Sequence, residues 1–368
     1  MKKINIIIIV TFISFISLPA FFGLILPKQS NSYIENRRLA KKPKAPKTTQ
    51  EIKDFPNSFD QYYADHFGFR WSLLHAYRHL KFLINDAPID SSVFGNEEGW
   101  IFYTSKIHGD VIGDYRNINQ FTTKQLNTFI QHLKEKQSWL AKQDIEYLFV
   151  IAPSKHYIYP EKLPDYIKPL AQPNMLEQLS VELKKHPEIN FINLAPNLLA
   201  EKDKQLLYFK ADTHWNFFAT NIAQFQIANT LVKLLGPGIT PYMYKPIEFT
   251  EKQEIQGDLA QYMGLGNYFI EEKLTPVFDP CTKYLPQDKN YFNTLCSGSE
   301  FNVLVFRDSF FSYLQPFISQ YFKNSTFVWQ YMTYKTAQEK ILHNKPNIVI
   351  EEWVDRRLPE SVNPNYEY

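Results

Sequence analysis

The sequence lacks the short motifs that mark the common nucleotide and zinc sites. Its 368 residues contain no GxGxxG after a strand, no P-loop, no HExxH and no paired CxxC. Its formal net charge is only +2, whereas a domain that binds nucleic acid usually carries a strongly basic face. We therefore expect no cofactor, no metal ion and no nucleic-acid partner.

Cysteine is also scarce, because the chain contains only Cys281 and Cys296. In an exported protein, which the N-terminus indicates, an isolated pair of this kind is a disulfide candidate. The alternatives are two unpaired thiols or a metal site, although two sulfurs without CxxC spacing make a poor zinc site. We expect a disulfide between Cys281 and Cys296.

One long apolar run is present, at the N-terminus. Two lysines precede an uncharged stretch over residues 4–26, which is long enough to span a bilayer as one helix. A cleaved secretory signal, with Ser30 or Ser32 at the cleavage site, is the alternative, but its apolar core is normally shorter. We favour a single-pass anchor over residues 1–27 in the cell inner membrane, with the body in the periplasm or on the extracellular face.

Residues 28–54 are rich in proline and lysine and are expected to form a basic tether. The domain is expected over 55–368. It begins with a helical stretch from Pro56 to about Ile84 that breaks near Gly68. Two short apolar runs on either side of Gly95 and Gly99 then predict a hairpin.

From about residue 122, helices and strands alternate. Apolar runs predict strands at 146–153, 189–196, 301–306, 325–331 and 347–352, and amphipathic periodicity predicts helices at 122–140, 173–186, 217–236 and from about 310. This alternation predicts an α/β domain with a parallel sheet covered by helices on both faces. Residues 237–300 hold both cysteines and are expected to be an irregular insertion in this domain.

Two polar motifs fall at predicted junctions that lead into helices, where parallel sheets collect functional groups. Ser309 lies in "RDSF" after the strand at 301–306, and "DTHWN" precedes the helix at 217–236. In a catalytic relay, Asp212 would orient His214, and His214 would take the proton of Ser309. In the alternative interpretation, Ser309 and Asp212 only cap the helices that follow them.

Other polar residues at the ends of predicted strands are candidates for binding substrate. Lys155 and His156 follow the strand at 146–153, in a segment that also reads as a loop bounded by prolines. The segment that ends the last strand is expected to form structural ion pairs or to hold a substrate hydroxyl. The full set of expected binding residues is Trp215, Asn216, Lys155, His156, Arg307, Glu352 and Arg356. A metal site on Asp212 and His214 ranks lower, because no further ligand is grouped with them.

Together these segments resemble the periplasmic alginate O-acetyltransferase family, whose members have an SGNH-hydrolase-like domain. The resemblance rests on Asp212, His214 and Trp215 as a D-x-H-W element and on Ser309-Phe310 after a strand. Weaker similarities are "ENRRLA", "YYADHFGFR", "GWIFY", "PSKHYIYPE", "QGDL" and "EEWVDRRL", spread over about residues 35–358. The Asp-x-His pair precedes the serine, as in the permuted acetyltransferase branch.

The resemblance implies that Ser309 is the nucleophile, His214 the general base and acid, and Asp212 its orienting partner. Ser309 would take an acetyl group and pass it to a hydroxyl of an exported polysaccharide. A membrane-bound O-acyltransferase would deliver the acetyl donor. The chain departs from the family pattern at Arg307 and Asp308, where a small residue usually precedes the serine. Two alternatives remain open: an O-acetylesterase with the same triad, and a non-catalytic glycan-binding subunit of an export complex.

Overall fold

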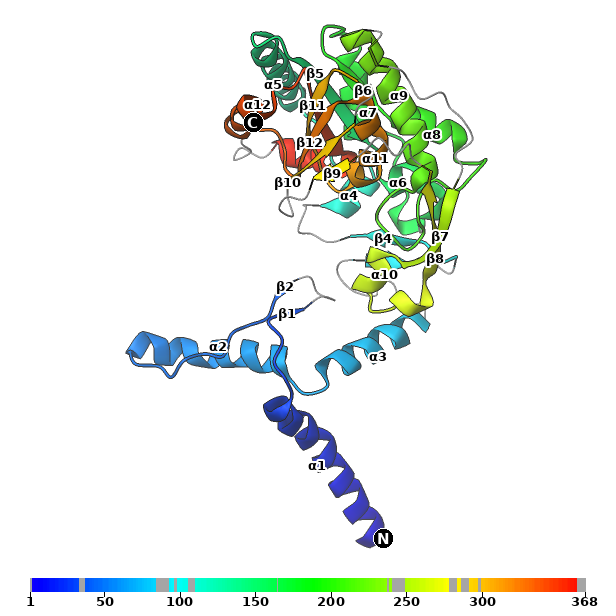
Figure 1. The fold of residues 1–368 in the computed structure, drawn as a ribbon. Coiled ribbons are helices and arrows are strands. Elements are labelled where there is room, and N and C mark those ends of the chain that lie inside the picture. Colours follow the sequence, from blue (N-terminus) through cyan, green and yellow to red (C-terminus); the bar gives the residue numbers. More distant parts are fainter. Residues whose placement is uncertain are drawn as a thin grey trace.

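The structure is a computed structural model, which describes residues 2–32, 37–83, 93–95, 98–104, 110–163, 165–236, 238–239, 249–277, 283–285, 291–296 and 299–362. Most of these residues form one α/β body, and the N-terminal helices extend from it (Figure 1). The strands and helices that position the candidate site all belong to the body.

A seven-stranded sheet forms the centre of the body, in the order β6-β5-β13-β11-β12-β10-β9. Neighbouring strands run parallel from β6 to β12, which confirms the predicted parallel sheet. Strands β10 and β9 extend it in antiparallel pairing. The strands are β6 (Phe191–Asn193), β5 (Glu146–Ala152), β13 (Ile348–Val354), β11 (Asn302–Phe306), β12 (Asn324–Val328), β10 (Tyr291–Leu295) and β9 (Lys283–Leu285).

Helices cover both faces of this sheet, as predicted (Figure 1). Helices α5 (Thr123–Ala141) and α12 (Tyr334–Asn344) lie on one face, where the rings of Trp139 and Tyr334 meet edge to face at 5.2 Å. The opposite face carries α8 (Ala195–Glu201), α9 (Phe217–Leu235) and α11 (Gln315–Ile318). Every residue of β13 is buried. A strand that is covered on both faces has a continuous run of apolar residues. For this reason β13 could be predicted from the sequence.

The segment near 237–300 is not the irregular insertion that was expected. Its described parts include β7 (Phe249–Gln256), α10 (Asp258–Tyr262) and β8 (Ile270–Pro276), and β7 pairs with β8 in an antiparallel ribbon. The same segment supplies β9 and β10 to the main sheet. The sequence "FTEKQEIQ" of β7 is mostly polar. Because a ribbon of this kind buries little apolar surface, its strands carry no clear alternation of apolar and polar residues.

The predicted disulfide lies partly outside the described residues, because Cys281 is not among them. Cys296 is buried directly after β10. The bond between these two cysteines stays a prediction.

The N-terminal region consists of α1 (Lys2–Ile25), α2 (Thr49–His66) and α3 (Arg70–Leu83). Within the described part of the chain, one stretch, Ile4–Gly23, is long and apolar enough to cross a membrane, with a mean hydropathy of 2.4. Helix α2 begins seven residues before the predicted start at Pro56, because Thr48 caps it by accepting from the backbone N–H of Glu51. The predicted break near Gly68 is confirmed.

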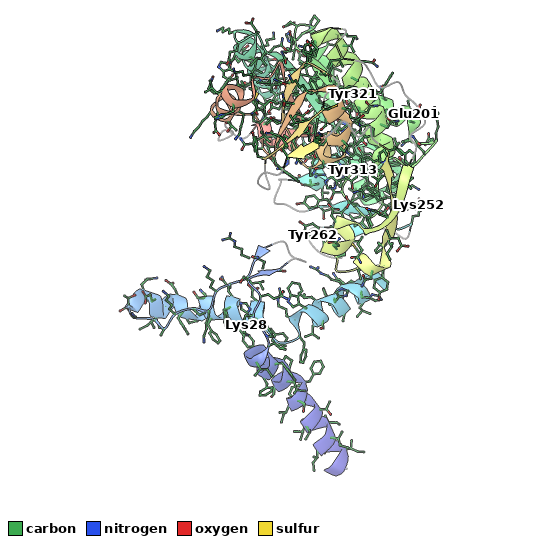
Figure 2. The ribbon with its side chains drawn as sticks, viewed as in Figure 1. Lys28, Glu201, Lys252, Tyr262, Tyr313 and Tyr321 are labelled. Atoms are coloured by element: carbon green, nitrogen blue, oxygen red, sulfur yellow. The ribbon has the colours of Figure 1, made fainter. Side chains whose placement is uncertain are left out.

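The end of α1 contacts the turn between α2 and α3, and these two helices extend to either side of it (Figure 1). The backbone N–H of Gly68 donates to the carbonyl of Pro19 at 3.1 Å. Lys28, labelled at this junction in Figure 2, places its amine 5.8 Å from the centre of the Tyr62 ring. Large apolar side chains remain exposed on both helices: Ile52, Phe59 and Tyr63 on α2, and Leu73, Tyr77 and Leu80 on α3.

The sheet brings three chain segments to one edge. The parallel pairing sets Val354 opposite Ala152, and Phe306 opposite Glu351. The loops that follow β5, β11 and β13 therefore start side by side. The predicted hairpin of β3 (Val93–Gly95) and β4 (Ile101–Tyr103) is confirmed. It approaches the same region, because the backbone N–H of Ile101 donates to the carbonyl of Lys210.

Candidate active site

Three side chains form a continuous hydrogen-bonded chain at this edge. The Nδ1 atom of His214 lies 2.7 Å from Oδ1 of Asp212, and its Nε2 atom lies 2.8 Å from Oγ of Ser309. The predicted convergence of these residues is therefore found, although 95 positions separate His214 from Ser309. Ser309 and His214 are partly exposed, whereas Asp212 is buried. A carboxylate, an imidazole and a hydroxyl in this order can activate the hydroxyl as a nucleophile.

The loop that carries Asp212 and His214 is closed at its base. Tyr208 and Trp215 form an isolated antiparallel bridge, and the backbone N–H of Asn216 donates to the carbonyl of Leu207. Asn216, not Asp212, caps α9, because its Oδ1 accepts from the backbone N–H groups of Phe218 and Ala219. The interpretation of Asp212 as a helix cap is therefore wrong, and its carboxylate is available to the histidine.

Neighbouring elements hold the loop from outside. The amine of Lys155, in the short helix α6 (Lys155–Ile158), donates to the carbonyls of Phe209, Lys210 and Asp212 at 3.2, 2.7 and 2.7 Å. The carboxylate of Glu271 on β8 accepts from the backbone N–H groups of Lys210 and Ala211. Burial lowers the pKa of Lys155 to about 8, although the negative charge of Asp212 acts to raise it. These contacts fix the backbone directly before His214.

A second carboxylate, Asp258 at the start of α10, completes the surroundings of His214. Its Oδ1 accepts from the backbone N–H and the hydroxyl of Thr213, and its Oδ2 lies 3.7 Å from Nδ1 of His214. Its own backbone N–H donates to Oδ2 of Asp212 at 2.8 Å. Sequence reasoning gave Asp258 no role, although "QGDL" was among the weaker similarities. That motif was the available signal.

The two carboxylates differ in their electrostatics. Burial alone would raise the pKa of Asp212, but the hydrogen bond and charge of His214 and two backbone N–H groups outweigh it and hold the pKa below its ordinary value. Burial and the charge of Asp212 raise the pKa of Asp258. Asp212 is therefore the carboxylate that stays ionised beside the histidine.

The turn that carries Ser309 is braced by buried charged groups. Asp308 accepts from the backbone N–H of Phe310 through Oδ1 and from that of Val354 through Oδ2, both at 2.8 Å. The backbone N–H of Asp308 donates to Glu352 at 3.2 Å. Burial and the charge of Asp308 raise the pKa of Glu352 well above its ordinary value. Ser309 precedes the 3₁₀ turn η5 (Phe310–Tyr313), and its side chain makes no capping hydrogen bond. The capping interpretation of Ser309 is therefore wrong as well.

Four of the expected binding residues have structural contacts instead. Trp215 is fully buried and donates its indole N–H to the carbonyl of Phe310. Asn216 caps α9, and Glu352 is fully buried under the serine turn. Arg307 is buried, stacks at 4.0 Å on the ring of Trp329 and donates to Ser312. These residues adjoin the site in sequence, but their side chains point into the body.

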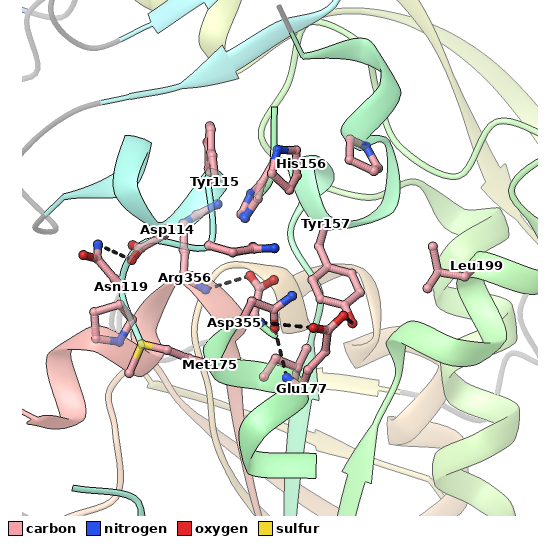
Figure 3. Close-up of a pocket in the computed structure, with 16 residues that line it drawn as sticks. Asp114, Tyr115, Asn119, His156, Tyr157, Met175, Glu177, Leu199, Asp355 and Arg356 are labelled. Carbon is pink, nitrogen blue, oxygen red and sulfur yellow. Dashed lines mark hydrogen bonds between the residues drawn. The ribbon is translucent and has the colours of Figure 1, made fainter. Parts of the chain in front are cut away.

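The remaining expected binding residues lie at or beside a cavity of about 300 Å³ (Figure 3). His156 and Arg356 line it, together with residues that sequence reasoning missed. The ring of His156 stacks on Tyr115 at 3.9 Å, and burial lowers its pKa well below its ordinary value, so the ring is neutral. The guanidinium of Arg356 lies 5.2 Å from the Phe310 ring. Arg356 therefore stands between the cavity and the serine turn.

The atoms of Asp212, His214 and Asp258 lie close enough together to hold a metal ion. However, Nδ1 of His214 is hydrogen-bonded to Asp212, and both Asp212 and Asp258 already accept backbone N–H donors. Nε2 of His214 points at Ser309. This donor set fits a proton relay better than a metal site.

A sequence model of a known family matches residues 93–354, more than half of the chain, and is described as the SGNH hydrolase-like domain of the acetyltransferase AlgX. The chain belongs to this family of SGNH hydrolase-like acetyltransferase domains. The matched range includes Asp212, His214, Asp258 and Ser309. The resemblance seen in the sequence is thereby confirmed. The comparison with curated protein sequences gives no match.

Solved structures resemble the chain at low identity. PatB1 of Bacillus cereus, solved with a sulfonyl adduct, is 15% identical with a TM-score of 0.50, over 72% of this chain and 97% of that one. The O-acetyltransferase domain of AlgJ from Pseudomonas putida is 14% identical with a TM-score of 0.48, over 73% and 92%. AlgX of Pseudomonas aeruginosa is 16% identical with a TM-score of 0.44, over 79% and 70%. At this identity the likeness to PatB1 concerns the fold alone.

Proposed function

We propose that this protein is a serine-dependent O-acetyltransferase that acetylates hydroxyls of an exported polysaccharide. The observation that carries the proposal is the hydrogen-bonded chain from Asp212 through His214 to Ser309. Its membership of an acetyltransferase family supports the same activity. No cofactor is needed, because each step transfers an acyl group and a proton between the donor, the enzyme and the acceptor.

The reaction takes two steps. In the first, Oγ of Ser309 attacks the acetyl carbonyl carbon of the donor while its proton passes to Nε2 of His214. The bond to the leaving group then breaks, the leaving group takes that proton, and acetyl-Ser309 remains. In the second, a sugar hydroxyl gives its proton to His214 and attacks the acetyl carbon, and Ser309 leaves with the proton returned. Asp212 keeps the proton on Nδ1 and stabilises the imidazolium in both steps.

The negative oxygen of each tetrahedral intermediate needs a hydrogen-bond donor. The backbone N–H of Asp308 already donates to Glu352, and that of Phe310 donates to Asp308. We therefore assign the oxyanion contact to the backbone N–H of Ser309. The side chain of Arg307, which with Asp308 replaces the usual small residue before the serine, contacts Trp329 and Ser312.

The test compares acyl-enzyme formation and product in the full-length protein. An activated acetyl ester is supplied with polysaccharide fragments, and intact-mass analysis follows acetylation of the protein. We expect acetyl-Ser309 in the wild type and none in Ser309→Ala. His214→Ala removes the base and should reduce the rate nearly as much as Ser309→Ala. Asp212→Asn should be somewhat less severe and should reduce the rate by a factor of about 10³ to 10⁴. A sulfonyl fluoride should label Ser309 and compete with acetylation.

The products separate the alternatives. Free acetate as the sole product with every acceptor would replace transfer by an O-acetylesterase activity. A Ser309→Ala strain that still makes fully acetylated polymer would favour a non-catalytic glycan-binding subunit. Thermal unfolding of each variant controls for loss of fold, because Ser309 is partly exposed and its replacement removes little packing.

We also propose that α1 anchors the protein in the inner membrane, with the body on the outer side. The apolar stretch Ile4–Gly23 supports the anchor. The exposed apolar side chains of α2 and α3, which join the end of α1, suit a position near the lipid surface. An acetyl donor delivered by a membrane-bound O-acyltransferase would then reach Ser309 close to the membrane. The anchor at 1–27 remains part of this proposal, whereas the boundary expected between residues 54 and 55 falls inside α2.

A further inference from the structure

We propose that the cavity beside the serine turn binds the acceptor sugar, and that this acceptor is a glycan without negative charge. The inference rests on the proposed acetyl transfer, because it names the substrate class for the same acetyl-serine. It is carried by the position of the cavity, by an unpaired carboxylate oxygen in its wall and by the charges of its lining.

The cavity leads toward the catalytic loop. Its volume of about 300 Å³ is at the lower end of the range for small-molecule pockets. Tyr115, His156 and Arg356 line it and also line a much smaller hollow, which reaches Lys155 and Thr213 beside Asp212 and His214. Figure 3 shows Tyr115, His156 and Arg356 grouped at one side of the cavity. A sugar ring in the cavity would thus extend toward the serine turn.

Its polar groups match sugar hydroxyls. Oδ1 of Asp114 accepts from the amide of Asn119 at 2.7 Å, while its buried Oδ2 has no hydrogen-bond partner among the described residues. A buried acceptor of this kind is satisfied by a ligand that brings a donor, and a sugar hydroxyl is one. The hydroxyl of Tyr157 makes a long contact of 3.4 Å with Glu177 and is also hydrogen-bonded to the side chain of Asn174. Because a hydroxyl both donates and accepts, its oxygen can also accept a hydrogen bond from a sugar hydroxyl.

Much of the remaining surface is apolar or aromatic, which suits the C–H face of a pyranose ring. Rings, prolines and aliphatic side chains alternate with the polar groups, as is usual for ligand pockets. These apolar lining residues include Tyr115, Tyr157, Met175, Leu176, Leu199 and Pro359.

The charges of the lining disfavour an anionic sugar. Among the described residues that line the cavity, three carboxyl groups, on Asp114, Glu177 and Asp355, face one cation, Arg356. Arg356 is adjacent to Asp355, whose Oδ1 accepts the backbone N–H of Arg356 at 2.7 Å. A uronate would bring its own carboxylate against these groups, and like charges in a partly buried site repel. A neutral hexose or N-acetylhexosamine meets no such repulsion.

The experiment measures binding to full-length Ser309→Ala protein, in which turnover is blocked. Neutral fragments of glucan, galactan and N-acetylglucosamine polymers are titrated by calorimetry against uronate fragments of equal length. At least one neutral fragment should bind, and uronates at least tenfold more weakly. Asp114→Asn should weaken neutral binding about tenfold, because the new amide places an N–H₂ group where the hydroxyl donates. Glu177→Gln should narrow the difference in affinity between neutral and uronate fragments, while its amide still serves the helix cap of α7 (Met175–Leu183).

Glu182→Gln on the same helix is the matched control and should change neither affinity, because Glu182 does not line the cavity. The inference is overturned if uronates bind as tightly as every neutral fragment, or if neither cavity variant alters binding. Acetylation of wild-type Ser309 by an activated ester is followed in parallel. Absence of acetyl-Ser309 would refute the proposed function. Its presence together with uronate preference would refute only the acceptor class.

Discussion

The carboxyl groups around the site experience opposite effects from their surroundings. Asp212 is buried but receives the imidazole and two backbone N–H groups, so the pKa of its carboxyl stays below the ordinary value. Asp114 is partly buried and Asp355 is buried, and burial raises their pKa values to about 7 and about 6. For Asp114 the difference follows from the number of donors, because one donor, the amide of Asn119, opposes the effect of burial. Asp355 receives backbone N–H groups of Ser154 and Arg356 and is still dominated by burial. Asp212 is therefore the carboxyl with the lowest pKa of the three.

The Asp114 carboxyl should make folding stability depend on pH. Its pKa in the folded protein, about 7, lies above the ordinary value of 3.8. Between these values the folded protein holds a proton that the unfolded chain has released, so this group's stabilising contribution falls as pH rises from about 4 to about 7. The effect of Asp114→Asn on the free energy of unfolding should therefore be more stabilising at pH 8 than at pH 4. The difference between the two effects should be on the order of a few kcal/mol.

Denaturant unfolding of both proteins at several pH values measures this effect. The free energy of unfolding of the variant minus that of the wild type should increase from pH 4 to pH 7 and then stay constant. A difference that is the same at pH 4 and pH 8 would show that burial of the Asp114 charge does not limit stability. Improved stability together with weaker glycan binding would be the expected trade-off at a functional carboxylate.

At the level of elements, the Asp-x-His loop depends on a close approach between α10 and the chain before His214. Gly257 precedes α10, and a Cβ placed on it would meet the carbonyl of Ala211 and lie 2.7 Å from the backbone nitrogen of Asp212. Both contacts are with backbone, so the two segments would have to separate. Asp258 would then lose its hydrogen bonds to Asp212 and Thr213.

Gly257→Ala should therefore reduce acetyl-Ser309 formation at least tenfold and destabilise the fold by about 1–3 kcal/mol. Gly95→Ala is the matched control, because its Cβ would meet its nearest neighbours at 3.5 and 3.6 Å, in ordinary contact. Acyl-enzyme formation and thermal unfolding are measured for both variants. If Gly257→Ala keeps full activity, the contact between α10 and the loop does not position His214.

For the whole molecule, the arrangement of α1 and the body predicts the topology. Helix α1 projects from the body, and its apolar residues are exposed (Figure 1). A membrane would cover this surface, whereas water would not favour it. Alkaline phosphatase fused after residue 368 should be active, because this enzyme requires export. The same fusion without residues 1–26 should be inactive, and an inactive full-length fusion that accumulates to the same level would refute the topology.

Elements that depend on a local pattern of residues could be predicted without the structure. Continuous apolar runs identified β5, β11 and β13, and helical periodicity identified α5, which Thr122 caps in the structure. These signals are strong because burial on both faces of a sheet, or on one face of a helix, imposes a fixed spacing. The motifs around Asp212, His214 and Ser309 were visible for the same reason, since they stand directly beside such elements.

Which of the neighbouring polar residues face the site could be learned from the folded chain alone. Trp215, Asn216, Arg307 and Glu352 adjoin the motifs in sequence, yet packing turns their side chains into the body. Asp258 and Glu271 come from the segment with the weakest pattern, yet hydrogen bonds bring them to the loop. The cavity wall joins residues from α4 (Val111–Tyr115), α7 and the end of β13. Local periodicity reports which face of an element is buried, whereas a site depends on contacts between distant segments that only the folded chain makes.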